Sequence, residues 1–108
     1  MNPDRTHMIA KDLISFHCPT VKLKFDRGLA VVGHANPVAV TLSYKWILKI
    51  KDDIALIELV LHEIGHVLCP VRGHGKDWAY IVAAIGGNPH RQFDEGRYVQ
   101  EAAHVPKA

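Results

Sequence analysis

The stretch IALIELVLHEIGHVL, residues 54–68, constrains the fold more than any other part of the chain. Its apolar residues cover nearly every side of a helix, so a helix formed here must be buried over most of its surface. Asp52 and Asp53 stand just before it, where an N-cap residue and a first-turn acid favour a helix start. We therefore expect a buried helix that carries HEIGH, residues 62–66, in its last turns.

The two histidines of HEIGH are spaced to bind one metal ion. His62 and His66 are four residues apart, which places both imidazoles on one face of a helix, one turn from each other. Glu63 projects about 100° around the helix axis from His62, beside the ion and not towards it. A carboxylate there can accept a proton from a water that zinc activates and return it to a leaving amine, as in HExxH metallopeptidases. Gly65 supports a site, because a glycine inside a helix costs about 1 kcal/mol against alanine and indicates close approach of another backbone or a ligand.

A catalytic zinc has three protein ligands and an open fourth position. His74 is the best candidate for the third ligand, since it lies in GHG, residues 73–75, after the break that Pro70 begins. We expect Gly73 and Gly75 to allow the backbone geometry that turns the loop back towards the helix. The predicted site consists of one Zn²⁺ ion, three ligands and a general base: His62, His66, His74 and Glu63.

Two other interpretations of the motif are open. A bare HExxH occurs by chance, and both histidines would then be ordinary core or surface residues, which explains neither Gly65 nor GHG. Alternatively, the chain is a noncatalytic zinc module that binds protein or DNA. A structural zinc usually has a fourth protein ligand and needs no carboxylate at Glu63, so the sequence favours the enzyme.

The remaining segments predict an α+β fold. Asn2 and Pro3 form a typical helix start, and the apolar residues from Pro3 to Phe16 recur at roughly helical spacing. Alternating apolar and lysine residues, and runs rich in β-branched and aromatic residues, predict strands. The strands join into a short antiparallel sheet of about three strands. The predicted elements in chain order are a helix over 3–16, strands over 20–26, 29–35 and 38–48, the helix over 54–68 and a further helix over 77–85.

The chain length and the net charge limit the architecture and the partners that we expect. At 108 residues the chain fits one domain, residues 1–108. Thirteen Lys and Arg against eleven Asp and Glu give a net charge of +2, which is too balanced to indicate nucleic-acid binding by composition. A nucleic-acid partner is supported only by a strip of lysines, and such a strip is usually a solvated face. The strip consists of Lys22, Lys24, Lys45, Lys49 and Lys51.

The cysteines and the N-terminus indicate a cytoplasmic protein. Cys18 and Cys69 form neither a CxxC pair nor a disulfide framework, so we expect two buried thiols in a reducing compartment. The N-terminus lacks a signal-peptide pattern, and no apolar run is long enough to span a bilayer. No membrane partner is predicted.

Several other side chains are candidates for roles at the site. Trp78 is expected to pack its helix against the HEIGH helix and so to fix the loop that presents His74. His34 stands at a strand end and could line the cleft. The histidines without a partner at ligand spacing are His7, His17, His34, His90 and His104. Three tyrosines are open candidates to stabilise an oxyanion: Tyr44, Tyr80 and Tyr98.

The order of VTLSYKW, HEIGHVL, GHGKDW and IGGNP along the chain resembles the SprT-like (Spartan/SprT) family of zinc metallopeptidases. The resemblance covers roughly residues 20–90 and leaves 91–108 as a tail. It implies a small zincin-like core, a protein or peptide substrate, His62, His66 and His74 as ligands and Glu63 as the base. In that family the strand before the HExxH helix edges the cleft, which implies that Val38 to Tyr44 pairs with an extended peptide.

The chain departs from larger family members. It has no CxxC zinc ribbon and none of the additional DNA-binding or partner-binding segments of Spartan-type proteins. It therefore resembles a minimal core of the kind that occurs in bacterial and bacteriophage genomes. Its size suggests a phage or prophage source. A phage protein with the same chemistry that acts on a host regulator is a third interpretation that the sequence leaves open.

Overall fold

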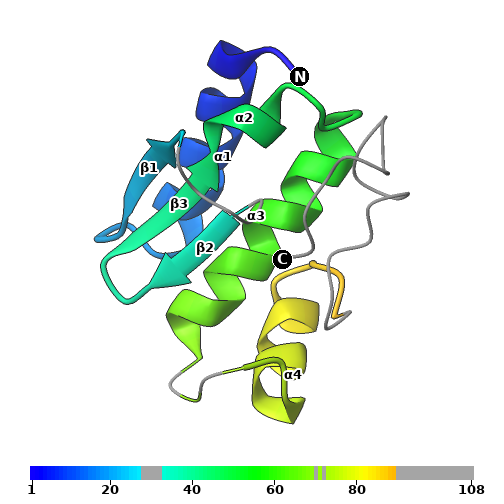
Figure 1. The fold of residues 1–108 in the computed structure, drawn as a ribbon. Helices are drawn as coiled ribbons and strands as arrows, with labels where there is room; N and C mark the ends of the chain where they lie inside the picture. The colour runs from blue at the N-terminus through cyan, green and yellow to red at the C-terminus, as the bar shows by residue number, and fades with distance from the viewer. Residues whose placement is uncertain (28–32, 70, 72, 90–108) are drawn as a thin grey trace.

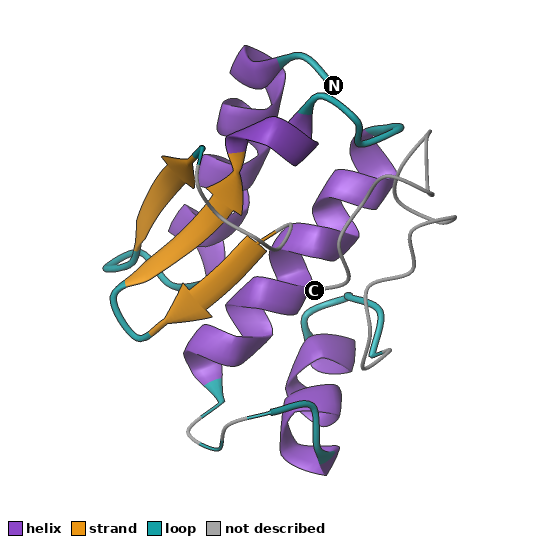
Figure 2. Ribbon diagram, in the orientation of Figure 1, coloured by secondary structure: helices purple, strands orange, loops and turns teal. Residues whose placement is uncertain are grey.

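The structure, a computed structural model, describes residues 1–27, 33–69, 71 and 73–89 (Figure 1). The described part has an α+β fold, as predicted, with a three-stranded sheet and helices (Figure 2). Its elements are α1 (Pro3–His17), β1 (Lys22–Asp26), β2 (Gly33–Asn36), β3 (Ala39–Ser43), α2 (Tyr44–Ile47), α3 (Asp53–Leu68) and α4 (Lys76–Ala84).

The helix starts follow from local capping. The Asn2 side chain accepts a hydrogen bond from the backbone N–H of Asp4 at 2.8 Å and caps α1. The Asp52 side chain accepts one from the backbone N–H of Ala55 at 2.8 Å and caps α3. Each cap satisfies a backbone donor that has no partner inside its helix. Both predicted N-caps are therefore confirmed.

The sheet is mixed, so the expected antiparallel sheet is wrong for one of its two pairings. The strand order is β1-β3-β2. β2 and β3 form an antiparallel hairpin, in which the Asn36 side chain accepts hydrogen bonds from the backbone of Val38 and Ala39 at 2.9 Å each. β1 pairs with the other edge of β3 and runs parallel to it. The tight turn fixes only the β2–β3 pairing, whereas the β1–β3 pairing depends on long-range packing.

The third strand is shorter than predicted. The strand expected over 38–48 ends at Ser43, and residues 44–47 form the single turn α2. Ile47 and Ile50 are each 1% exposed, so α2 and the residues directly after it place two apolar side chains in the core. The carbonyl oxygen atoms of Ile47, Leu48 and Ile50 accept hydrogen bonds from the amino group of Met1 at 2.9–3.2 Å. Burial and these contacts override the strand preference of the segment.

α3 is the buried central helix that its apolar composition predicts. Leu56, Val60 and Ile64 are 0% exposed within the main core, which α1 and the sheet complete. Arg5 of α1 forms an ion pair with Asp53 at the first turn of α3. α3 runs beside β2, and α4 packs on α3 (Figure 1). Within the described residues, no helix is both long enough and apolar enough to cross a bilayer.

Candidate metal centre

Three histidine side chains converge beside the last turns of α3. His62 and His66 come from α3, and His74 comes from the loop that precedes α4. The Nε2 atom of His74 lies 2.9 Å from Nε2 of His66 and 3.2 Å from Nε2 of His62. Their ligand atoms all lie within 4.8 Å of one another. The structure therefore brings together the three residues that the sequence predicts as ligands.

The contacts among the three rings favour a shared cation over hydrogen bonding among the rings. An imidazole Nε2 has one in-plane position, which holds either a proton or a lone pair. Nε2 of His74 thus cannot donate to one neighbour and accept from the other. Three nitrogen atoms bound to one zinc at 2.0–2.1 Å in a tetrahedral arrangement are roughly 3.3 Å apart, close to the separations found here. The residues present therefore fit a single metal ion.

The protonation states of His62 and His66 also favour metal binding. Burial, followed by the charges of His66 and His74, lowers the pKa of His62 from 6.5 to about 3. Burial, followed by the charge of His74, lowers the pKa of His66 from 6.5 to about 4. Both imidazoles are therefore neutral near pH 7, and neutral imidazole is the form that coordinates metals.

Glu63 is a buried carboxyl group beside the three histidines. Its side chain is 3% exposed, and burial raises its pKa from 4.5 to about 8. It lines the same cleft as His62, His66 and His74. A bound dication would favour the charged carboxylate and would lower this pKa. Glu63 thus lines the cleft, and its pKa depends on two opposing effects: burial raises it, and a bound cation would lower it.

Gly33 on β2 lets the sheet approach Glu63, and the sequence interpretation did not identify it. A Cβ atom at Gly33 would lie 3.2 Å from Oε2 of Glu63 and 3.3 Å from the carbonyl oxygen atom of Thr41. Both separations are tighter than most contacts of a real Cβ. The signal available in the sequence was a glycine inside a predicted strand, which often indicates a close approach.

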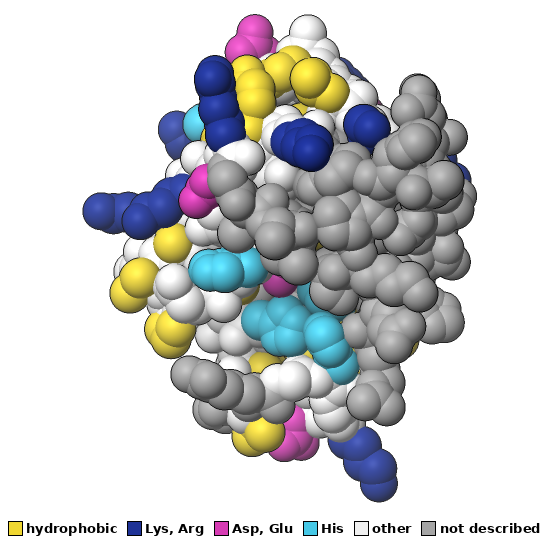
Figure 3. All heavy atoms as spheres, in the orientation of Figure 1, with side chains coloured by type: hydrophobic (Ala, Val, Ile, Leu, Met, Phe, Trp, Pro, Cys, Tyr) yellow, Lys and Arg dark blue, Asp and Glu magenta, His cyan; other side chains and the backbone are white. Residues whose placement is uncertain are grey.

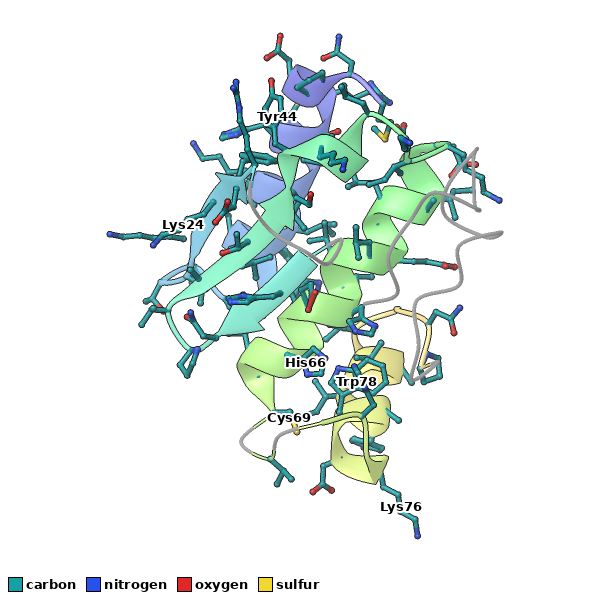
Figure 4. The ribbon with its side chains drawn as sticks, in the orientation of Figure 1. Lys24, Tyr44, His66, Cys69, Lys76 and Trp78 are labelled. Atoms are coloured by element: carbon teal, nitrogen blue, oxygen red, sulfur yellow. The ribbon has the colours of Figure 1, made fainter. Side chains whose placement is uncertain are left out.

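Gly65 and Trp78 join α3 to α4 directly behind the histidines. A Cβ atom at Gly65 would lie 2.3 Å from Cγ2 of Val82 and 2.9 Å from Nε1 of Trp78. The Trp78 indole is 1% exposed and donates a hydrogen bond from Nε1 to the main-chain carbonyl oxygen of His62 at 3.3 Å. Figure 4 shows His66 of α3 next to Trp78 of α4. The predicted packing of Trp78 is confirmed. The close approach expected at Gly65 is also present, but side chains of α4 make it and not another backbone or a ligand.

The two glycines around His74 differ in their roles. Gly73 has φ +93°, in the left-handed region that favours glycine, so the predicted backbone freedom is used there. Gly75 has φ −76° and is the N-cap of α4, so the same expectation is wrong for Gly75. An N-cap adopts extended backbone angles that most residues can reach, and among the described residues of this loop the left-handed conformation occurs at Gly73.

A cleft of about 500 Å³ opens over the three histidines and Glu63. One wall is β2 and the turn after it, residues 33–37, and the other includes Cys69, Val71 and Gly73. Histidine side chains gather near the centre of this face of the molecule (Figure 3). The site is thus accessible to a ligand, although Glu63 is almost fully buried.

Comparisons with protein-family models, curated proteins and solved structures found no match. The functional argument for this chain therefore depends on the chemistry and geometry of its own residues.

The strand that edges the cleft is β2, which corrects the expectation for Val38 to Tyr44. β3 is the central strand and pairs with β1 on one side and with β2 on the other. Its backbone groups are used on both edges, so it cannot add a peptide strand. The outer edge of β2 has no strand partner in the part of the chain that the structure describes. Of the described strands, β2 alone offers an edge next to the histidines that could pair with an extended peptide.

The remaining sequence candidates lie elsewhere, apart from His34, which lines the cleft. Tyr44 packs against Phe25 with ring centroids 6.3 Å apart, and Figure 4 places it far from His66. Tyr80 is 77% exposed on α4 and does not line the cleft. The predicted burial of both thiols is confirmed, since Cys18 and Cys69 are free and buried. Outside the described residues lie Tyr98, His90 and His104.

The other described histidines and the lysines of the strip do not line the cleft. The His7 ring stacks on Phe25 at a centroid distance of 5.7 Å, and the His17 ring packs edge-on against Phe16 at 4.9 Å. Lys24 of the strip projects from β1, far from His66 in Figure 4. A nucleic-acid partner remains a prediction that the site itself does not support.

Proposed function

We propose that the protein is a zinc-dependent metalloendopeptidase in which Glu63 is the general base. The observation that carries the proposal is the convergence of three histidine Nε2 atoms beside a buried carboxyl group in one open cleft. A closed structural zinc site would have a fourth protein ligand. Among the described residues, the group contains three histidines and no further Cys, Asp or Glu ligand.

The chemistry divides between the metal and the chain. His62, His66 and His74 would hold the zinc ion, which when bound would supply an activated water and a Lewis acid for the substrate carbonyl. Glu63 accepts the proton of the attacking water and then donates it to the departing amine. His62 and His66 stay neutral at neutral pH because burial lowers their pKa values, so they remain available as ligands.

The proposed substrate is a protein or peptide in extended conformation. The outer edge of β2 offers backbone groups alongside the cleft, and a peptide that pairs with it would pass over the histidines. The HExxH helix, the third histidine in the following loop and the small α+β fold also agree with the proposed SprT-like, zincin-type assignment.

Metal content and hydrolysis together test the proposal. Purified native protein, His74→Ala, Glu63→Gln and His7→Ala would be analysed for bound metals and for cleavage of unfolded casein. His7 is an exposed histidine on α1 and is the matched control. We expect one zinc equivalent in the native protein, Glu63→Gln and His7→Ala, a marked loss in His74→Ala, and hydrolysis only by the native protein and His7→Ala.

Two results would contradict the proposal. Full zinc binding by His74→Ala would refute the three-histidine site. Casein cleavage by Glu63→Gln at the native rate would refute the role of the carboxylate. A native protein that binds zinc but cleaves nothing would instead favour the noncatalytic module.

A further inference from the structure

The wall of the cleft that β2 forms presents a histidine that the proposed metal site does not use. Side chains alternate between the two faces of a strand. Gly33 is buried against Glu63, and Ala35 packs against the main core. His34 and Asn36 lie on the opposite face, are exposed and line the cleft. One face of β2 therefore packs against Glu63. The other face is exposed to solvent, and its side chains line the cleft.

The other polar side chains of the lining already have partners or roles. The three converging histidines and Glu63 form the metal centre. The side-chain oxygen atom of Asn36 accepts two backbone hydrogen bonds of the β2–β3 turn. The thiol of Cys69 donates to the carbonyl oxygen of Val71 at 3.2 Å. Among the described residues, His34 has neither a hydrogen-bond partner nor an ion-pair partner.

We propose that His34 contacts the substrate, donating a hydrogen bond from its imidazole to a main-chain carbonyl oxygen of a peptide bound along the edge of β2. Neutral and charged imidazoles both carry an N–H donor, so the contact needs no change of protonation. A main-chain carbonyl is common to all peptides, and the contact would hold a substrate in place whatever its side chains. This inference rests on the proposed function and adds a substrate-binding residue to the same cleft.

Two zinc-directed probes separate contact with a peptide from contact with the metal. Acetohydroxamate reaches the zinc alone, whereas acetyl-trialanine hydroxamate also extends along the cleft. Dissociation constants of both would be measured on zinc-loaded native protein, His34→Ala, His34→Gln and His7→Ala. The His34→Gln side chain retains an N–H donor, and His7→Ala removes an exposed histidine outside the cleft.

We expect His34→Ala to weaken the peptide hydroxamate about threefold to tenfold, the effect of one neutral hydrogen bond, and to leave acetohydroxamate unchanged. His34→Gln should recover part of the loss, and His7→Ala should match the native protein. Zinc content should be equal in all four proteins. For casein, kcat/KM should fall in the same order.

Equal affinity of the peptide hydroxamate for His34→Ala and native protein would overturn the proposal. So would equal weakening of both probes, which would place His34 at the metal, or a native protein that binds the peptide probe no tighter than acetohydroxamate. A different pair of results would contradict the proposed function and leave the role of His34 intact. In that case the peptide hydroxamate binds through His34 as expected, but the native protein hydrolyses no casein.

Discussion

The indole Nε1 of Trp78 donates a hydrogen bond to the main-chain carbonyl oxygen of His62 at 3.3 Å. The same indole lies against the rings of His62, His66 and His74, at centroid distances of 4.8, 5.4 and 4.7 Å. One buried side chain of α4 therefore contacts all three histidines of the metal site. Trp78 therefore links the packing of α4 on α3 to the position of His74.

Two substitutions of Trp78 should distinguish the contribution of its packing to stability from that of its hydrogen bond. Trp78→Phe keeps most of the buried area and should lower the free energy of unfolding by about 1–2 kcal/mol. Trp78→Ala leaves a cavity and should lower it by about 3–5 kcal/mol, with weaker zinc binding. Urea unfolding of metal-free protein and zinc titration against a competing chelator measure both effects. Native zinc affinity in Trp78→Ala would refute a positioning role for the indole.

Gly65→Ala should destabilise the α3–α4 contact. The new Cβ atom would lie 2.3 Å from Cγ2 of Val82, a separation at which the Val82 side chain or the helix that carries it must shift. We expect a loss of about 1–3 kcal/mol in the free energy of unfolding and a decrease in zinc affinity. The control is Gly75→Ala, where a Cβ atom meets nothing within 4 Å and φ is −76°, and a loss below about 1 kcal/mol is expected. Equal losses at the two positions would contradict the steric argument.

The stability of the metal-free protein should decline above about pH 6.5. Burial raises the pKa of Glu63 from 4.5 to about 8, so in this range the folded state holds more protons on this carboxyl than the unfolded state does. Its contribution to stability therefore falls as the pH rises from 4.5 to 8. The pKa values of His62 and His66 are lowered from 6.5 to about 3 and about 4, so their contributions rise with pH and level off near 6.5.

Glu63→Gln tests this pH dependence directly. Between pH 6.5 and 8 the native metal-free protein should lose on the order of 2 kcal/mol of stability, and Glu63→Gln should lose much less. Chemical unfolding in the presence of a chelator, repeated across this pH range, gives both curves. Parallel decline of the two proteins would mean that another group causes the loss.

Asp52→Ala should weaken the fold without altering the metal centre. The Asp52 side chain caps α3 at its start, whereas His62 and His66 lie in the last turns of the helix. Loss of the cap should cost about 1 kcal/mol of stability. Zinc affinity, measured at a temperature where the variant is folded, should match that of the native protein. A lower affinity would show that the first turn of α3 influences the site.

The helices could be predicted from the sequence because their signals are local. Asn2 and Asp52 cap the helices that they precede, and the spacing of His62 and His66 places both on one face whatever surrounds the helix. His74 was identified because glycines flank it in the loop directly after α3. Gly65 indicated a close contact, since its energetic cost in a helix is local as well.

The sequence by itself thus determined the α+β class, the three long helices, the N-caps of α1 and α3, and the histidines that could share a metal ion. Only the tertiary structure decided the parallel pairing of β1 with β3, the end of β3 at Ser43 and the position of β2 at the edge of the cleft. It also placed Gly33 against Glu63 and His34 on the cleft wall. The physical reason is that the spacing of residues in one helix follows from 3.6 residues per turn, whereas strand partners and the surroundings of a side chain depend on segments far apart in the chain.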